Sequence, residues 1–405
     1  MKRNLIRVSI VISLLVVVFT LGAFKDLTDY EKRNKFEPVF EILNYIEDNY
    51  YDIDKVDYDN ILNETLTGTM KGLNDPFAWY FTPRMTQENK IDTESKYGGI
   101  GAVVTYNSQY ECLEVVSPME GSPARKAGLK VGDLIVTIDG HDVAETGYYE
   151  SVDLLRGEPG TEVTVEVYRD NLEEPLIITI LRERIEIKTV KYAKFDYEDA
   201  EIGYIRITQF SEPTYNEFAR ALGEVVDSDG LIIDLRDNPG GLLNSVLNIS
   251  SLLLPAGKTV ITIEDRDGSK EIYRSWGSDA AKYLKDKPIV TLINEGSASG
   301  SEILTGALKD HDLATIIGTT TFGKAAVQTV YDVSNGGEIW LPTAHYLTPN
   351  GSDIHLKGIS PDITVDTTET IIDSNEGMTT TEANIDFDKD VQLQKGLEVI
   401  LEELK

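Results

Sequence analysis

Two short turns in this sequence combine small residues with a preceding apolar run. "NEGSASGSE" (294–302) follows "PIVTLI" and leads into the helical "ILTGALKD", and "DNPGG" (237–241) follows "DGLIIDLR". A strand-to-helix turn of small residues leaves backbone amides free at the positive end of the helix dipole, where negative charge is stabilised. Two such amides can form an oxyanion hole, worth about 3 to 4 kcal/mol per donor. For either turn alone, however, helix capping is the commoner role.

A serine in the first of these turns needs a base to become a nucleophile, and histidine is not indicated. No local signature surrounds the four histidines, His141, His311, His345 and His355. The G-x-S-x-G elbow of many serine hydrolases is also absent, because position 297 is serine where that pattern needs glycine. The sequence therefore gives no support to histidine catalysis.

Lysine is the other candidate base. "GTTTFGKAAVQ" (318–328) places Lys324 just beyond the strand-like "LATIIG", among apolar neighbours. Only a neutral lysine accepts a proton, so burial must lower its pKa from the usual value of about 10.4. Gln328 lies four residues on, on the same face of a strand, where its amide oxygen could accept a hydrogen bond from the ammonium. Taken alone, an ordinary surface lysine is the simpler interpretation.

These motifs occur together and in the same order in the C-terminal processing peptidases, or tail-specific proteases, which the chain resembles over nearly its whole length. The family's nucleophile pattern is matched by "INEGSASGSEI", its base pattern by "FGKAAVQTV" and its R-x-N-P-G-G-L turn by "RDNPGGL". "HYLTPNG" and "KGISPDITV" resemble two downstream segments. The departures are small: Gly300 stands where alanine is commoner, and His345 is unexpected before Tyr346.

The resemblance implies a serine endopeptidase with a Ser-Lys dyad. In this resemblance Ser299 is the nucleophile, Lys324 is the base and Gln328 orients the lysine. The oxyanion donors are backbone amides, one from Gly240 or Gly241 and the other from Gly300. No metal and no cofactor are expected. The implied fold is multidomain α/β, with a crotonase/ClpP-like peptidase core, an inserted PDZ domain and a helical N-terminal region.

The PDZ resemblance implies a class of substrate. "YGGIGAVV" and "GSPARKAGLKVGDLIVTIDG" resemble a domain that binds an extended chain end as an added strand and holds its carboxylate with loop amides. The expected peptide-binding loop contains Gly98, Gly99, Ile100 and Gly101. Arg156 in "LLRGEPG" matches an arginine that in relatives takes part in switching the protease on. Protein or peptide C-termini are therefore the expected partners.

The pattern of apolar and polar residues predicts four regions after residue 25. Residues 26–95 have helical apolar spacing, residues 96–184 alternate short strands with two short helices as in a small half-open β-barrel, and residues 185–365 read as strand, turn, helix units of a mainly parallel sheet. Ligands of such sheets bind beyond the carboxyl ends of the strands. Residues 366–405 form an acidic connector and an amphipathic helix. Helices at both ends suggest a homodimer.

Residues 1–25 are predicted to be a membrane anchor or a cleaved signal peptide. Three basic residues precede an uncharged run of 17 residues at 8–24, which is about 25 Å long as a helix. The basic start places the remainder outside the cell in both cases. The residues before Phe24 make a poor cleavage site, which favours a single-pass anchor at the cell membrane with the catalytic part extracytoplasmic.

Composition excludes several other classes. The formal net charge of −31 leaves no basic surface for nucleic acid, and the single cysteine, Cys112, excludes a disulfide framework and a cysteine-based metal site. Two alternatives to an active protease remain open. One is a catalytically inert PDZ scaffold on a peptidase-like core. The other is an acyl-transferring or hydratase enzyme of the same fold, which the inserted PDZ-like segment disfavours.

Overall fold

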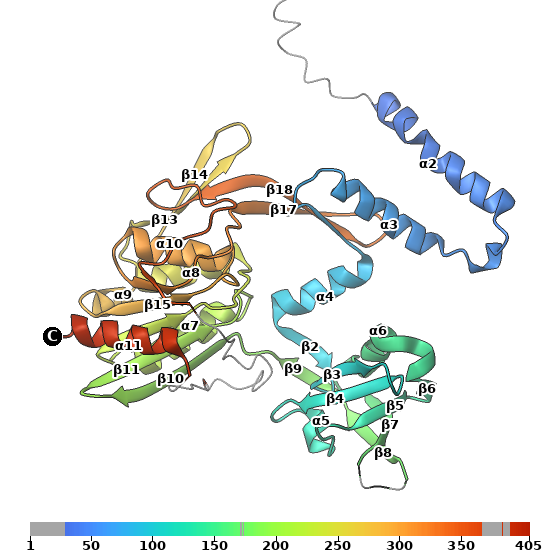
Figure 1. Ribbon diagram of the computed structural model, residues 1–405, viewed down its shortest axis with the longest axis horizontal. Coiled ribbons are helices and arrows are strands. Elements are labelled where there is room, and N and C mark those ends of the chain that lie inside the picture. Colours follow the sequence, from blue (N-terminus) through green and yellow to red (C-terminus); the bar gives the residue numbers. More distant parts are fainter. Residues whose placement is uncertain (1–28, 171, 173, 367–382, 384–388) are drawn as a thin grey trace, which may run out of the picture. The chain divides into compact units, whose positions relative to one another are not determined.

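The computed structural model describes residues 29–170, 172, 174–366, 383 and 389–405 of two compact units, 1–66 and 67–405 (Figure 1). The anchor predicted at residues 8–24 and most of the predicted acidic connector lie outside the described residues. Within the described ranges, no helix is long and apolar enough to cross a membrane.

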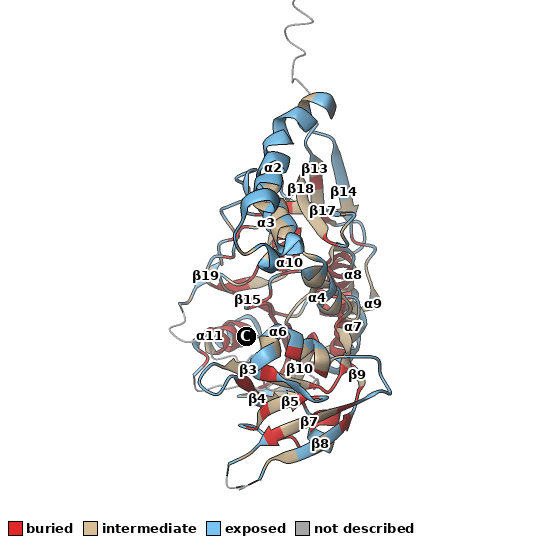
Figure 2. Ribbon diagram, turned by 90° about the vertical axis from the view of Figure 1, so that its right-hand side faces the viewer, coloured by how far each residue is buried: buried red, intermediate tan, exposed pale blue. Residues whose placement is uncertain are grey.

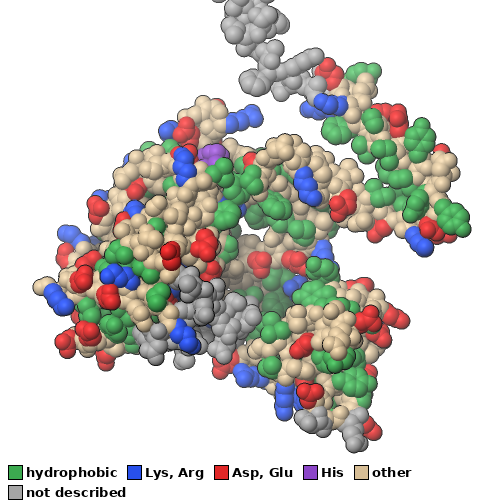
Figure 3. Space-filling view, in the orientation of Figure 1, with side chains coloured by type: hydrophobic (Ala, Val, Ile, Leu, Met, Phe, Trp, Pro, Cys, Tyr) green, Lys and Arg blue, Asp and Glu red, His purple; other side chains and the backbone are tan. Residues whose placement is uncertain are grey.

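The first unit is helical, as its apolar spacing predicts. It contains α2 (Asp29–Asn49), the short 3₁₀-helix η1 (Ile53–Lys55) and the start of α3 (Tyr58–Lys71), which continues into the second unit. Large apolar side chains along α2 are exposed, among them Phe36 and Phe40 at 54% and 61% (Figure 3). Within this unit, the apolar side of α2 is therefore not covered.

The PDZ region is built around one five-strand path in the order β3-β4-β5-β7-β8, with β6 paired to β5. Alternation of valine with polar residues along β7 buries Val163, Val165 and Val167 on one face. The separate pair β2–β9 brings the entering and leaving chains side by side in antiparallel register. The elements are β2 (Lys96–Gly99), β3 (Ala102–Asn107), β4 (Cys112–Pro118), α5 (Pro123–Lys126), β5 (Leu134–Ile138), β6 (His141–Asp142), α6 (Val143–Leu155), β7 (Glu162–Tyr168), β8 (Leu176–Leu181) and β9 (Glu183–Glu186).

A six-stranded sheet in the order β10-β11-β12-β15-β16-β19 forms the centre of the peptidase region. Every pair from β11 to β19 is parallel, as the continuous apolar runs predict, and only the β10–β11 pair is antiparallel. The strands are β10 (Val190–Tyr197), β11 (Ala200–Ile207), β12 (Gly230–Asp234), β15 (Ile289–Ile293), β16 (Thr315–Gly318) and β19 (Ile363–Thr364).

Helices cover both faces of this sheet, so its strands are buried (Figure 2). Alternate residues of β12 enter different cores: Leu231 and Ile233 pack with α7, α8 and α10, whereas Ile232 packs with α11. The α/β fold predicted for this region is thus confirmed. The helices are α7 (Thr214–Val225), α8 (Leu243–Leu253), α9 (Asp279–Leu284), α10 (Gly300–Asp310) and α11 (Val391–Glu403).

A second sheet lies beside the first and was not evident from the apolar runs. Its central strand β18 (Glu338–Leu347) pairs with β1 (Trp79–Phe81), β13 (Thr259–Asp265) and β17 (Ala326–Asp332), and β14 (Lys270–Arg274) extends the sheet from β13. Trp340 of β18 is paired with Trp79 on one side and with Val330 on the other. This sheet joins the segment before α4 (Pro83–Glu94) to the strand that follows Lys324.

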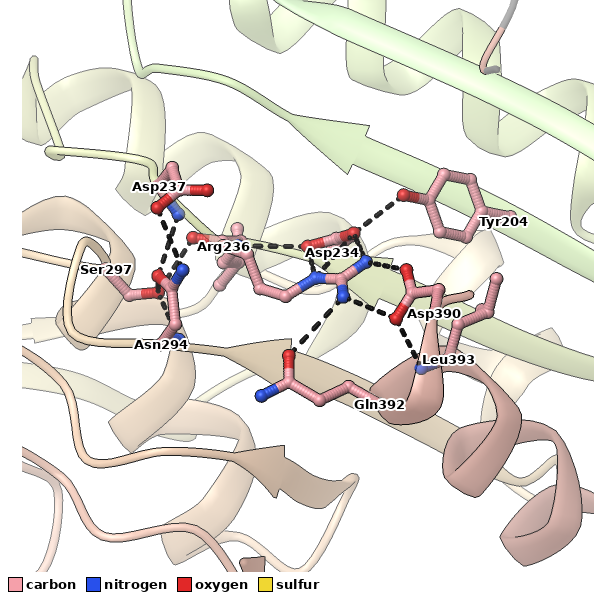
Figure 4. Close-up of polar contacts among 10 residues, drawn as sticks. Tyr204, Asp234, Arg236, Asp237, Asn294, Ser297, Asp390, Gln392 and Leu393 are labelled. Carbon is pink, nitrogen blue, oxygen red and sulfur yellow. Dashed lines mark hydrogen bonds and ion pairs between the residues drawn. The ribbon is translucent and has the colours of Figure 1, made fainter. Parts of the chain in front are cut away.

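A buried ionic network fixes α11 to the sheet (Figure 4). Arg236, which is 5% exposed, donates from Nε to Asp234 (3.0 Å) and from Nη2 to Asp390 (2.7 Å), at the start of α11. Tyr204 donates to Asp234 at 2.7 Å. Burial alone would raise the pKa of Asp234, but the Arg236 guanidinium outweighs it and holds that pKa at about 2. Asp234 therefore stays ionised through the neutral range, and the network ties α11 to the strand that leads into the 237–241 turn.

Candidate active site

Ser299 stands at the junction of β15 and α10, in the turn that the sequence singled out. Its backbone has φ 51° and ψ −109°, a sparsely populated region for a residue with a Cβ, which costs roughly 1–3 kcal/mol. The neighbouring serines are fully buried, and their hydroxyls donate to carbonyl oxygens: Ser297 to Leu235 and Ser301 to Asn238, both at 2.8 Å. Ser299 is half-buried and forms a capping box with Glu302, and within the described ranges its hydroxyl proton is not donated to another residue.

The 237–241 turn packs directly on this elbow. The amide of Ala298 donates to the Asn238 carbonyl at 3.0 Å, and Asn294 and Asp237 exchange a pair of hydrogen bonds at 2.8 and 2.9 Å (Figure 4). A Cβ on Gly240 would lie 2.7 Å from the Gly300 nitrogen and from the Ser299 Cβ. Glycine at position 240 is therefore what lets the two turns approach each other.

The amides around Ser299 differ in their availability. Gly240 N–H donates to Asn238 Oδ1 at 2.9 Å, so this amide is already engaged. Over the described ranges, neither the Gly241 nor the Gly300 amide donates to another residue. Gly241 has φ +138°, and a Cβ there would lie 2.0 Å from the Phe210 carbonyl oxygen. Of the two glycines that the sequence left open, Gly241 is thus the one with a free donor.

Glu302 joins the elbow to the lysine loop. This fully buried carboxylate accepts from the amides of Ser299 (2.9 Å) and Lys324 (2.8 Å) through Oε2. Through Oε1 it accepts from the Thr321 hydroxyl (2.6 Å) and the Gly323 amide (2.7 Å). One side chain in the first turn of α10 therefore fixes the backbone of both predicted catalytic residues.

Tyr346 makes a second link between the same two residues. Its hydroxyl donates to the carbonyl oxygens of Lys324 (2.8 Å) and Ser299 (3.1 Å). Burial, together with the Glu302 carboxylate, raises the pKa of Tyr346 well above its usual range, so the hydroxyl keeps the proton that it donates. Glu302 thus holds the amides and Tyr346 the carbonyls of Ser299 and Lys324.

Lys324 has the surroundings that a neutral amine needs. Among the residues that the structure describes, its ammonium makes no hydrogen bond or ion pair with another side chain. Burial lowers the pKa of Lys324, although the nearby Glu302 carboxylate acts in the opposite direction. The Nζ atom lies 5.8 Å from the centre of the Phe77 ring.

Gln328 lies on β17 close to this lysine, but it has a different partner from the one expected. Its Nε2 donates to the Phe77 carbonyl oxygen at 2.7 Å. No hydrogen bond joins Gln328 to Lys324 within the part of the chain that the structure describes. The predicted orienting bond from the lysine to the Gln328 amide oxygen is therefore not formed here.

The predicted PDZ residues lie together at the start of that region. Gly99 and Arg156 form an isolated β-bridge, and the Gly157 amide donates to the Gly98 carbonyl at 3.0 Å. The Arg156 guanidinium lies 5.7 Å from the Tyr97 ring centre and 3.9 Å from Asp153. The carbonyls of Ile100 and Gly101, by contrast, are bound within the region, by the amides of Ala124 and Met119.

Within the described ranges, no group of three or more His, Cys, Asp or Glu side chains is arranged so that it could hold a metal ion. His345 and His355 stack on each other at 4.4 Å between ring centres. Burial, and then the charge of His345, lower the pKa of His355. The imidazole of His355 is therefore predominantly neutral near pH 7.

Comparison with known proteins gives matches to a peptidase family and to a PDZ domain. A model of peptidase family S41 matches residues 201–365, and a PDZ domain model matches residues 114–169. The "Probable CtpA-like serine protease" of Staphylococcus aureus is 36% identical over 367 residues, which cover 89% of this chain and 71% of that protein. The "Carboxy-terminal-processing protease" of Bartonella bacilliformis is 35% identical over 360 residues, covering 87% and 80%.

A solved structure of the photosystem II D1 C-terminal processing protease is also similar, with 30% identity, a TM-score of 0.45 and coverage of 81% of this chain and 86% of that one. The fold and the matched regions define a serine peptidase that carries a PDZ domain. The chain belongs to peptidase family S41, among the carboxy-terminal-processing proteases.

Sequence reasoning missed three residues that contact the site. Glu302 is the last residue of "NEGSASGSE", and nothing in that stretch indicates that its four donors come from the elbow and from the loop that carries Lys324. Tyr346 was noted only as part of a motif. Phe77 lies far away in the sequence, in "NDPFAWYF", and nothing in that stretch indicates the lysine.

Proposed function

We propose that the chain cleaves protein substrates with a dyad of Ser299 and Lys324. The carrying observation is the double link between the two residues, because the Glu302 carboxylate and the Tyr346 hydroxyl each bind the backbone of both. Within the described residues, the hydroxyl proton of Ser299 and the half-buried amine of Lys324 have no acceptor or ionic partner, which fits the roles of nucleophile and base. An inert scaffold has no need of a strained serine whose backbone is tied to that of a desolvated lysine.

The steps follow from these groups. Neutral Lys324 takes the proton of the Ser299 hydroxyl as the oxygen attacks the scissile carbonyl carbon. The amides of Gly241 and Gly300 donate to the oxyanion of the tetrahedral intermediate. The Lys324 ammonium then gives its proton to the leaving amine, and an ester to Ser299 remains. Water, deprotonated by Lys324, hydrolyses that ester and restores the enzyme.

The PDZ region selects substrates by their C-termini and gates the protease in this proposal. Strand β3 has one paired edge, with β4, so an extended peptide can be added at its other edge, and the loop at residues 98–101 would hold the terminal carboxylate. Arg156 bridges to Gly99 of this loop, which places it where a bound carboxylate could replace Asp153 as its partner. Binding would then be communicated to the core through Arg156.

An unstructured protein substrate tests this function directly. Wild-type enzyme is expected to cleave it, and a version with an amidated C-terminus is expected to be cleaved at least about 10-fold more slowly, because a neutral end loses its charge-assisted hydrogen bonds. Arg156→Ala should cleave both versions at the same slow rate. Lys126→Ala, which alters an exposed pair with Glu183, is the control. Equal cleavage of both versions by wild type would contradict the gating role of the PDZ region. If wild type cleaved neither version, the proposed proteolytic activity would be wrong.

Location and assembly complete the proposal. The basic start and the apolar run at residues 8–24 support a single-pass anchor with the catalytic part extracytoplasmic. The exposed apolar residues of α2 support a homodimer formed through the first unit of the chain. Sedimentation of wild type and a Phe36→Asp, Phe40→Asp variant in detergent tests the dimer: the variant should be monomeric. A monomeric wild type at micromolar concentration would contradict it.

A further inference from the structure

The cover over Lys324 comes from a distant part of the sequence. Phe77 is 7% exposed, and its ring centre lies 5.8 Å from Lys324 Nζ. The ring contacts Phe322 and His355 edge-on, at 6.4 and 5.5 Å between centres. Phe77 therefore belongs to an aromatic cluster that lies beside the amine.

Several bonds hold Phe77 in this place. Its amide donates to Asp75 Oδ1 at 2.8 Å, and its carbonyl accepts from Gln328 Nε2 at 2.7 Å. Strand β1, which begins two residues later, is registered on β18 by Trp79 opposite Trp340. The Gln328 bond is the one that comes from the strand directly following Lys324, so it couples the cover to the base.

An aromatic ring can act on an amine in two opposing ways. Its π face attracts the ammonium, which favours the protonated form, but this attraction fades near 6 Å from the ring centre. Its bulk also excludes water, which favours the neutral form. At 5.8 Å the first effect is weak, so exclusion of water dominates. The lowered pKa of Lys324, with burial as its main cause, agrees with this balance.

We propose that Phe77 is a positioning residue that shields the Lys324 amine from water, and that Gln328 serves the dyad by holding Phe77 over the lysine. The inference rests on the proposed function, in which Lys324 is the base. It gives Gln328 a role through Phe77 in place of a direct bond to the ammonium. The two roles predict opposite pH shifts, because a lost acceptor would lower the pKa of Lys324, whereas a loosened cover would raise it.

Other titratable groups around the amine must be distinguished in such a measurement. They are Glu302 on α10, Tyr346 and His345 on β18, His355 beyond the Phe77 ring and Asp75 before it. The pKa of His355 is lowered and that of Tyr346 is raised well above its usual range.

The test is the pH dependence of kcat/KM on a short peptide substrate. Phe77→Ala is expected to move the acidic limb up by about one pH unit or more, toward the ordinary lysine value near 10.4, so that activity at pH 7 falls about 10-fold and recovers at high pH. Phe77→Leu keeps the apolar cover and should stay close to wild type. Phe81→Ala, which removes a ring of β1 packed on Trp340 at 5.0 Å between centres, is the control and should leave the limb in place.

Gln328→Ala decides between the two roles of that side chain. A shift of its limb to higher pH, with no further shift in the Phe77→Ala, Gln328→Ala double variant, supports the proposal. A shift to lower pH, or an unmoved limb in Phe77→Ala, overturns it. Activity of Lys324→Ala reports on the dyad separately: if that variant is inactive while the Phe77→Ala limb is unmoved, the shielding role fails and the dyad stands. If Phe77→Ala does not fold, Phe77→Leu and Gln328→Ala still give the result.

Discussion

Lys324→Ala is expected to reduce kcat at least about 10⁴-fold without unfolding the protein. The variant removes the only group near Ser299 that is proposed to accept the hydroxyl proton, while Glu302 and Tyr346 contact only the backbone of residue 324 and keep their bonds. In the wild type, the rate should rise with pH as the lysine loses its proton and then level off. Because burial lowers the pKa of Lys324, this rise lies below the range of an exposed lysine.

Controls separate the base from a merely positive side chain. Lys324→Arg keeps the charge but has no accessible neutral form, so it should be inactive at every pH. Ser299→Ala should lose as much activity as Lys324→Ala, and the double variant should lose no more, because the two residues act as a unit. Lys357→Ala, at an exposed lysine paired with Asp353, should behave as wild type. If the Lys324→Ala enzyme kept more than a few per cent of the wild-type kcat, the proposed Ser299–Lys324 dyad would be contradicted.

Glu302→Ala should impair both stability and activity. The variant leaves four donors without their acceptor: the amides of Ser299, Gly323 and Lys324 and the hydroxyl of Thr321. Each unsatisfied buried group costs about 1–3 kcal/mol. We expect a loss of at least about 3 kcal/mol in the free energy of unfolding, measured with urea. Misplacement of the reacting groups by about 1 Å should lower kcat about 100-fold.

Glu302→Gln isolates the charge from the geometry. The amide nitrogen of the new glutamine cannot accept a hydrogen bond, so the two donors that faced the replaced oxygen lose their partner. We expect the plateau of the pH profile to fall about 10-fold, which corresponds to the loss of at least one hydrogen bond. The lost negative charge no longer favours the ammonium, so the acidic limb should move to lower pH. Glu295→Gln is the matched control, because this exposed glutamate of the same turn accepts only from Thr319. Unchanged kcat in Glu302→Ala would show that Glu302 does not position the dyad.

The sequence predicted the parts of this site that depend on local order. The strand before Ser299 and the helix after it follow from an apolar run, small residues and an amphipathic segment, so the turn between them can be located without the fold. Lys324 could be placed beyond β16 for the same reason. The Ser299 and Lys324 roles themselves needed the match of several motifs, because either residue alone has a simpler interpretation.

The contacts across the site could not be predicted from the chain. Phe77 reaches Lys324 through the pairing of β1 with β18, and half-exposed strands such as β17 give no strong apolar pattern. The choice of Gly241 over Gly240 depends on where the Asn238 side chain turns, which spacing does not determine. Glu302 combines a predictable place on a helix with donors from two loops, and only the folded chain brings these together.

The backbone of Ser299 has a consequence for how this protein can change over generations. Its φ of 51° suits glycine better than any residue with a Cβ, so Ser299→Gly relieves strain at the moment it destroys the nucleophile. In the absence of selection for activity, substitution by glycine at position 299 would therefore give a more stable but inactive protein. Serine at this strained position is therefore explained by the proposed reaction and not by the preference of the backbone.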